Sequence, residues 1–213
     1  MRKNMVLSML EKKDADAEHI AQKVIERSEL LPELLSGVSS ANPRVRFGSA
    51  KVLRTISEHH PKLLYSRMGF FVDLLDSHNN ILKWNAIDII AKLTMVDSRN
   101  KFNRLFKKFY SHLYDGSLIT AGHIVGNSGK IALYKPELRD KITNELLKVE
   151  EVPLPTSECR QILIGHAINA FQLYYNQIKN KDKAVSFVKR QLKSSRHATR
   201  TKAERFLEGF SKP

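Results

Sequence analysis

The fold is decided by residues 42–56, which read NPRVRFGSAKVLRTI. Starting at Val45, apolar or small residues occupy the first position and the positions 4, 7, 8 and 11 residues later. An α-helix has about 3.6 residues per turn, so these five positions lie on one face. The second of them is the small residue Ser49, which would let a neighbouring helix approach closely. Residues 42–56 are therefore predicted to form a helix that packs tightly against another helix.

The same spacing recurs four more times along the chain. The later repeats start at Leu82, Leu118, Leu163 and Thr199, at successive intervals of 37, 36, 45 and 36 residues. Three intervals lie close to the roughly 40-residue period of helix-pair solenoids. The long interval contains residues 149–155, VEEVPLP, whose prolines exclude a helix interior. In the third repeat, glycines at 122, 126 and 129 replace apolar residues, which makes its pattern degenerate.

A further helical stretch precedes each of these repeats. The predicted first helices cover residues 29–38, 62–75, 102–113, 137–147 and 183–192, and a helix over 15–27 would cap the stack. The predicted fold is an all-α, right-handed α-α superhelix of about five helix pairs. It forms one domain over 1–213, with units at about 28–60, 61–98, 99–135, 136–180 and 181–213 and the cap at 1–27.

The first repeat carries a resemblance to a known family. Residues 31–35, LPELL, followed by residues 42–50, NPRVRFGSA, resemble a HEAT repeat, with a proline in the first helix and a Val-Arg pair opening the second. Residues 61–97 repeat this pattern more loosely, and the later units keep only the spacing. The resemblance implies an armadillo-like α-solenoid that binds partners through the concave surface lined by its second helices. It implies no particular activity.

The chain is strongly basic, and the excess is uneven. It contains 36 Lys and Arg against 22 Asp and Glu, a net charge of +14. Residues 1–100 carry 15 − 12 = +3 and residues 101–213 carry 21 − 10 = +11. This excess indicates an anionic partner, which could be an acidic protein, a nucleic acid or an anionic membrane surface. The other interpretation is a solvated face on a terminal capping unit.

The single cysteine, Cys159, excludes a disulfide framework and a cysteine-based metal site within one chain. It favours a reducing, cytoplasmic setting. The apolar run near the N-terminus is too short for a signal peptide, and no stretch has the length of a membrane span. No metal-ligand spacing, nucleotide fingerprint or catalytic triad is present, so the sequence predicts no cofactor and no metal.

Candidate binding residues are polar positions on the second helices and in the basic run 189–202. They are Arg46, Lys83, Trp84, Asp88, His166, Arg196, Arg200, Lys202 and Arg205. The Gly-rich segment 122–130 lacks the spacing of a phosphate loop. It is predicted to be a closely packed or bent helix and a flexible point of the stack.

Three functions remain open at this stage. The leading prediction is a non-catalytic scaffold that binds a protein partner through its concave face or its basic C-terminal edge. The second is a nucleic-acid-binding module whose basic residues contact phosphates. The third is a HEAT-like DNA glycosylase that excises alkylated bases, with Trp84 and Asp88 one helical turn apart beside Lys83. Against the third, Phe47 and Trp84 occupy matching positions and are more simply interpreted as aromatic residues that pack between repeats.

Overall fold

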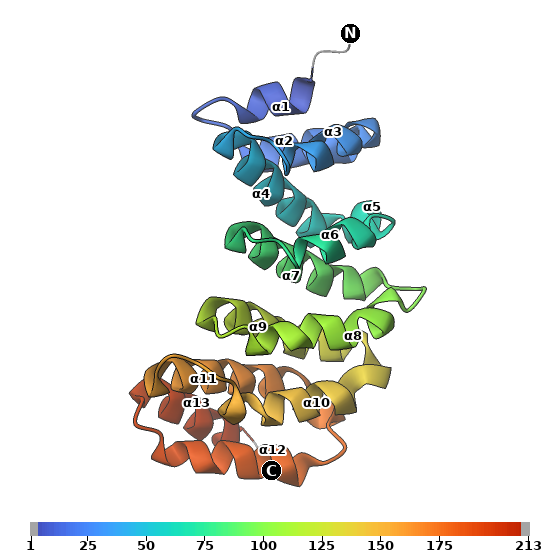
Figure 1. The fold of residues 1–213 in the computed structure, drawn as a ribbon. Coiled ribbons are helices and arrows are strands. Elements are labelled where there is room, and N and C mark those ends of the chain that lie inside the picture. Colours follow the sequence, from blue (N-terminus) through green and yellow to red (C-terminus); the bar gives the residue numbers. More distant parts are fainter. Residues whose placement is uncertain (1–3, 210–213) are drawn as a thin grey trace. The chain divides into compact units, whose positions relative to one another are not determined.

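The computed structural model of the chain describes residues 4–209. Over these residues it contains thirteen α-helices and seven short 3-10 helices, and no strand. The chain divides into two compact units, with unit 1 ending at Arg99 and unit 2 beginning at Asn100. Within each unit, successive helices form stacked layers (Figure 1). The boundary between the units lies next to the predicted boundary at residues 98 and 99, and the single domain over 1–213 stays a prediction.

Unit 1 contains seven of the α-helices. They are α1 (Met5–Leu10), α2 (Ala17–Glu26), α3 (Leu31–Gly37), α4 (Pro43–His59), α5 (Pro61–Tyr65), α6 (Met68–Leu74) and α7 (Asn80–Leu93). The predicted helix over 15–27 is α2, which begins after Asp16; the Asp16 carboxylate accepts hydrogen bonds from the Glu18 and His19 N–H groups. The short helix α1 has no counterpart among the predictions.

The helix predicted over residues 62–75 is two helices, α5 and α6, separated at Ser66 and Arg67. Both of them pack against α7. The bend between them lets Leu64 and Phe71 reach the core together, and both are fully buried. Periodicity alone gave no sign of this break, because both halves keep helical spacing.

Unit 2 contains the other six α-helices. They are α8 (Lys101–Ser111), α9 (Leu118–Tyr134), α10 (Arg139–Leu147), α11 (Ser157–Tyr174), α12 (Lys181–Arg190) and α13 (His197–Glu208). Helix α11 packs against both α9 and α13, and α10 packs against α12. The predicted insertion at 149–155 is a 3-10 turn over Val149–Glu151 followed by irregular chain. Helix α11 then begins six residues before Leu163, which gives it an additional N-terminal turn.

The predicted core spacing is confirmed in α4, α7 and α11, where all five positions are buried. In α13, Thr199, Ala203 and Phe206 are buried and Leu207 is half-buried, whereas Phe210 lies outside the described residues. The spacing thus identified the side of each of these helices that meets its neighbours.

The predicted register of the third repeat is wrong. Leu118 and Gly122 are half-buried and Gly126 is exposed. The N-cap residue Ser117 places the start at Thr120, because the caps of α4 and α7 also lie three residues before their repeat starts. From that start, four of the five core positions are buried: Thr120, Ile124, Ser128 and Ile131. The small polar residues of α9 fill core positions, so apolar spacing alone misplaced the register.

Helix α9 needs a glycine at only one of its three glycine positions. A Cβ on Gly129 would lie 2.8 Å from the Ala170 carbonyl oxygen of α11. A Cβ on Gly122 would meet nothing within 4 Å, and one on Gly126 would meet only His166 at 3.9 Å. Close packing is therefore confirmed at Gly129, where the backbones of α9 and α11 meet.

A serine-based turn sets the start of three second helices. In each, the serine hydroxyl oxygen accepts a hydrogen bond from the backbone N–H two residues later, at the N-cap position. The pairs are Ser40 with Asn42 (3.2 Å), Ser77 with Asn79 (3.1 Å) and Ser194 with Arg196 (3.2 Å). Such hydroxyl-to-backbone bonds stabilise tight turns. The recurrence shows that the first, second and fifth repeats share local chemistry as well as apolar spacing.

Replacing Ser49 by Ala is expected to stabilise unit 1 by about 1 kcal/mol. The Ser49 hydroxyl is fully buried and its oxygen has no hydrogen-bond partner. The equivalent position in α7, α11 and α13 is alanine. Urea unfolding of the full chain measures the change. The control is Ser57→Ala in the same helix, because the buried Ser57 hydroxyl donates to the Arg54 carbonyl at 2.6 Å. If both variants change stability alike, the unpaired hydroxyl is not the cause.

Candidate functional site

The second helices of unit 2 leave one side uncovered, here called the open stripe. Its positions fall one residue before each repeat start and 3, 6 and 10 residues after it. They are Ile119, His123, Gly126 and Lys130 in α9, Ile162, His166, Asn169 and Leu173 in α11, and Ala198, Lys202 and Arg205 in α13; all are exposed or half-buried. Because α9 packs on α11 and α11 on α13, equivalent positions lie in rows across the three helices.

Three basic side chains occupy the row three residues after each repeat start: His123, His166 and Lys202. The Lys202 ammonium donates a hydrogen bond to the Gly165 carbonyl at 3.3 Å. Gly126 follows His123 by about one turn in α9. A Cβ added at Gly126 would lie 3.9 Å from His166 Nδ1 of α11. We call this set, together with the Arg196 guanidinium, the cationic row.

The members of the cationic row act on one another electrostatically. Burial lowers the pKa of His166, and the positive charges of Lys202 and Arg196 and the imidazole of His123 lower that pKa further. Burial likewise lowers the pKa of Lys202, with Arg196 contributing. Partial desolvation and like charge both disfavour the protonated forms. The opposite charge of a bound anion would offset both effects, so the row is electrostatically suited to an anionic ligand.

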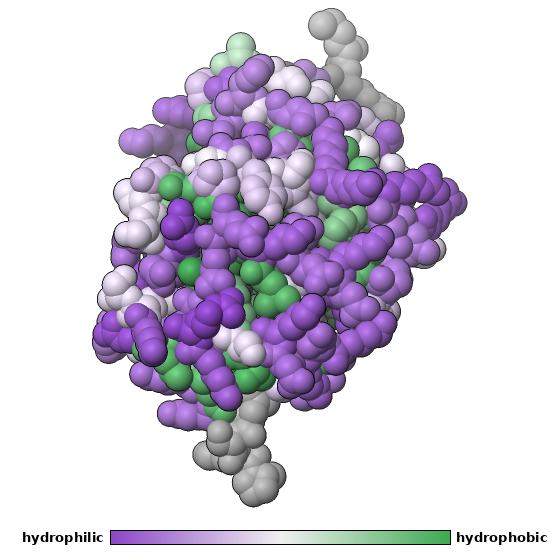
Figure 2. Space-filling view, turned by 60° about the horizontal axis from the view of Figure 1, so that its bottom comes forward, coloured by the Kyte–Doolittle hydropathy of each residue, from purple (hydrophilic) through white to green (hydrophobic). Residues whose placement is uncertain are grey.

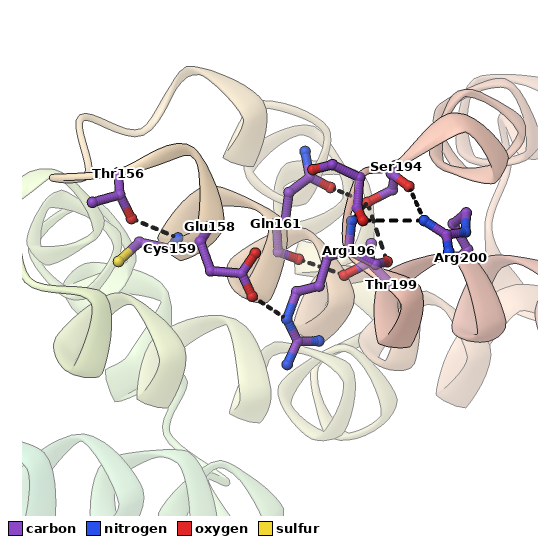
Figure 3. Close-up of polar contacts among 9 residues, drawn as sticks. Thr156, Glu158, Cys159, Gln161, Ser194, Arg196, Thr199 and Arg200 are labelled. Atoms are coloured by element: carbon purple, nitrogen blue, oxygen red, sulfur yellow. Dashed lines mark hydrogen bonds and ion pairs between the residues drawn. The ribbon is translucent and has the colours of Figure 1, made fainter.

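Arg196 stands at the edge of the row, at the N-cap position of α13. Its Nε donates to the Glu158 carboxylate at 2.7 Å, linking α13 to the start of α11 (Figure 3). The Thr199 hydroxyl also joins these helices by donating to the Gln161 carbonyl at 2.8 Å. Arg196 therefore has a carboxylate partner of its own, whereas His166 and Lys202 form no ion pair with any carboxylate among residues 4–209.

Arg200 lies off the open stripe and holds a turn together. Its Nη1 donates to the carbonyl oxygens of Ser194 and Ser195 at 2.6 and 3.1 Å (Figure 3). Arg46 makes the matching contact in unit 1, where Nη1 donates to the Ser40 carbonyl at 3.0 Å. Both arginines follow a repeat start by one residue and reach back six residues. The sequence predicted that Arg46 and Arg200 would face a partner. In the structure, both side chains hydrogen-bond to the turn that precedes their own helix.

The other candidate residues of unit 1 lie along α7. Lys83 and Trp84 are half-buried. Asp88 forms an ion pair with Arg54 of α4, with 4.0 Å between Arg54 Nη1 and Asp88 Oδ2. The Arg46 guanidinium lies 4.8 Å from the centre of the Phe47 ring. Asp88 thus links the second helices of two adjacent repeats.

The structure brings together His166, Arg196 and Lys202, and places exposed Arg205 one turn along α13 from Lys202. It adds His123, which the sequence reading did not include among the candidate residues. Counted from the misplaced start at Leu118, the positions that match His166 and Asn169 fall on Ala121 and Ile124, and both are buried. The signal that could have corrected it was Ser117, a strong N-cap residue directly after Gly116.

Hydrophobic residues accompany the polar ones on the open stripe. Ile119 is 51% exposed and Leu173 is 50% exposed. Figure 2 shows hydrophilic residues over most of the visible face, with hydrophobic residues visible between them in several places. Among residues 4–209, no group of three or more His, Cys, Asp or Glu side chains could hold a metal ion. None of the helices in this range is long and apolar enough to cross a membrane.

Acidification is expected to destabilise unit 2 through His166. Its pKa lies below the ordinary value in the folded chain, so the unfolded chain takes up a proton first as pH falls. The loss of stability therefore begins near the unfolded pKa of about 6.5 and levels off below the folded value. Urea unfolding of wild type and His166→Asn between pH 7.5 and 4.5 isolates this contribution, because other groups cancel in the difference. Parallel curves for the two proteins would contradict it.

Comparisons with known proteins identify the fold class. A scan against protein families finds no match for this sequence, and a search of curated proteins finds no relative. Solved structures do match. The designed armadillo repeat protein YIII(Dq)4CqI has a TM-score of 0.65 at 17% identity, covering 96% of this chain and 98% of the other. The designed armadillo repeat protein YIII(Dq.V1)4CPAF, in complex with peptide (KR)4, has a TM-score of 0.69 at 15% identity, covering 99% and 100%.

These matches and the helices described above confirm the predicted all-α solenoid fold. The fold is armadillo-like, and the resemblance to HEAT repeats stays a resemblance. Helices α5, α6 and α7 fit this result, because armadillo repeats have three helices where HEAT repeats have two. At identities of 15–17% the likeness concerns the fold alone.

Proposed function

We propose that this chain is a non-catalytic repeat scaffold that binds an extended segment of a partner protein along its second helices. One observation carries the proposal: the second helices of unit 2 align their uncovered positions in rows across three neighbouring helices. Support also comes from the fold, since a designed protein of similar fold was solved in complex with a peptide. The proposal treats residues 1–213 as one working domain in the cytoplasm.

The dimensions of the open stripe suit an extended peptide. Packed helices lie about 8–10 Å apart, so three of them span about 18 Å between their axes. An extended chain rises about 3.3 Å per residue, so about six residues cross the stripe. In this proposal His166, Lys202 and Arg205 contact the partner directly. Arg46 and Arg200 support the turns before their helices. In α7 of unit 1, Asp88 falls six residues after the repeat start, as the stripe positions do, whereas Lys83 matches Arg46 and Trp84 matches Phe47.

Selection of a random octapeptide library against the full chain tests this proposal. Peptides are expected to be enriched, and Asn169→Trp is expected to weaken their binding at least tenfold because Asn169 is exposed at the centre of the stripe. The matched control is Ser186→Trp, at an exposed position of α12, which should leave binding unchanged. Circular dichroism checks that both variants fold. Absence of enriched peptides, or equal binding by both variants, would reject the scaffold proposal.

The nucleic-acid and glycosylase alternatives are tested separately. A nucleic-acid module with +14 net charge should bind random duplex DNA with steep salt dependence. No binding at low salt would reject both alternatives together. For the glycosylase, release of an alkylated base by wild type is compared with release by Asp88→Asn. Equal release by the two proteins would exclude a catalytic role for Asp88. Its ion pair with Arg54 would then be its role in the structure.

A further inference from the structure

The cationic row places basic groups from three consecutive second helices next to one another. His123 comes from α9, His166 from α11 and Lys202 from α13, with Arg196 at the edge. The three side chains come from different helices, so their closeness does not stabilise any single helix. Like charges in a partly desolvated place cost free energy unless an opposite charge compensates them.

The compensation inside the chain is incomplete. Glu158 is the carboxylate beside the row, and its oxygen is taken by Arg196 at 2.7 Å. Lys202 has a backbone carbonyl as its hydrogen-bond acceptor, at 3.3 Å, which is long for a charged donor. His166 and Lys202 are half-buried and have no carboxylate partner among the described residues. Two groups of the row are therefore available to an external anion.

Resting on the proposed function, we infer that the cationic row binds the carboxylate side chains of an acidic, extended peptide segment. Lys202 and His166 are the main contacts, and His123 extends the row to the next helix. The ligand has the opposite charge to the (KR)4 peptide in the solved complex of similar fold. Its acidic residues face the row, and its aliphatic residues lie on Ile119 and Ile162, which flank the row one turn away.

The flanking residues favour a peptide over a nucleic acid. The row one residue before each repeat start contains Ile119, Ile162 and Ala198, which are aliphatic. Aliphatic side chains pack well against peptide side chains, whereas single-stranded bases bind by stacking on aromatic rings. The basic side chains of His166 and Lys202 are also half-buried, which suits single carboxylates that reach in between side chains.

Binding should become tighter as pH falls from 7.5 to 5.5. In the free chain, Lys202, Arg196 and His123 oppose protonation of His166, and Glu158 on its own helix is engaged by Arg196. A bound carboxylate favours the imidazolium, so binding is accompanied by proton uptake. In acid, His166 therefore lowers the folding stability of the free chain and raises its affinity for the acidic peptide.

Fluorescence anisotropy of labelled (Asp-Glu)4 with the full chain tests the inference, with (Lys-Arg)4 and (Gly-Ser)4 as comparison peptides. Only the acidic peptide is expected to bind. Lys202→Gln should weaken it about tenfold. The control Lys189→Gln removes the same charge from an exposed position of α12 and should change affinity less than twofold. His166→Asn should reduce the tightening between pH 7.5 and 5.5, and the double variant His123→Asn, His166→Asn should abolish it.

Each other outcome counts against the inference. Equal weakening by Lys202→Gln and Lys189→Gln means that net charge, and not the row, attracts the peptide. Tighter binding of a single-stranded oligonucleotide that competes with (Asp-Glu)4 assigns the row to nucleic acid. If library peptides bind and Asn169→Trp blocks them but they carry no acidic residues, the acidic specificity is wrong and the scaffold stands. If no peptide of any charge binds, the proposed function itself fails.

Discussion

Replacing Gly129 by Ala is expected to destabilise unit 2 by about 3 kcal/mol. The new Cβ would lie 2.8 Å from the Ala170 carbonyl oxygen and 3.0 Å from its Cα, distances that normal packing does not allow. Both contacts are backbone atoms of α11, so relief requires α9 and α11 to move apart. The main helix contact of unit 2 would then loosen. Urea unfolding of the full chain, followed by circular dichroism, measures the loss.

The matched control is Gly122→Ala, two turns earlier in the same helix. A Cβ there meets nothing within 4 Å, so only the helix preference of alanine over glycine remains. That preference should stabilise unit 2 by about 0.5–1 kcal/mol. The two substitutions are chemically identical and are expected to have opposite signs. If Gly129→Ala also stabilises the chain, the backbones of α9 and α11 are not in contact there.

Replacing Arg200 by Ala is expected to cost about 2 kcal/mol of unit 2 stability. Its guanidinium donates to the Ser194 and Ser195 carbonyls, which stand in the turn before α13. Loss of the charged donor leaves these carbonyls without their partner and frees the turn that sets the start of α13. Thermal unfolding detects the loss, and Arg200→Lys should recover part of it, since a single ammonium replaces the two-carbonyl contact incompletely.

Arg205→Ala serves as the comparison, because Arg205 is exposed on the open stripe. It should change stability by less than about 0.5 kcal/mol. Its effect is expected on acidic-peptide affinity instead. If Arg200→Ala leaves stability unchanged and removes binding, Arg200 contacts the partner and its turn contact is incidental.

Arg205 and Arg200 were both predicted to contact a partner, and the structure places only Arg205 on the open stripe. Both belong to α13, and composition treats them alike. Their spacing from the repeat start differs, which places Arg205 on the open stripe and turns Arg200 toward the preceding turn. The matching contact of Arg46 with Ser40 shows that the Val-Arg pair of the first repeat also has a structural role.

The sequence by itself determined the all-α class, the alternation of helices and the buried side of α4, α7 and α11. Those features follow from local spacing, because 3.6 residues per turn decide which side chains share a face. It also identified His166, Arg196 and Lys202 as candidate residues from their positions alone.

Only the tertiary structure decided the division into α5 and α6 and the place of His123 beside His166, and it corrected the register of α9 that apolar spacing had misplaced. Each depends on which neighbouring helix covers a given side. In α9, Gly129 is buried where α11 approaches closely, and Ser128 is buried with its hydroxyl 2.9 Å from the Tyr110 hydroxyl of α8. Apolar spacing cannot detect core contacts made by such small residues. The cationic row exists for the same reason: its members are far apart in sequence and meet only when α9, α11 and α13 pack together.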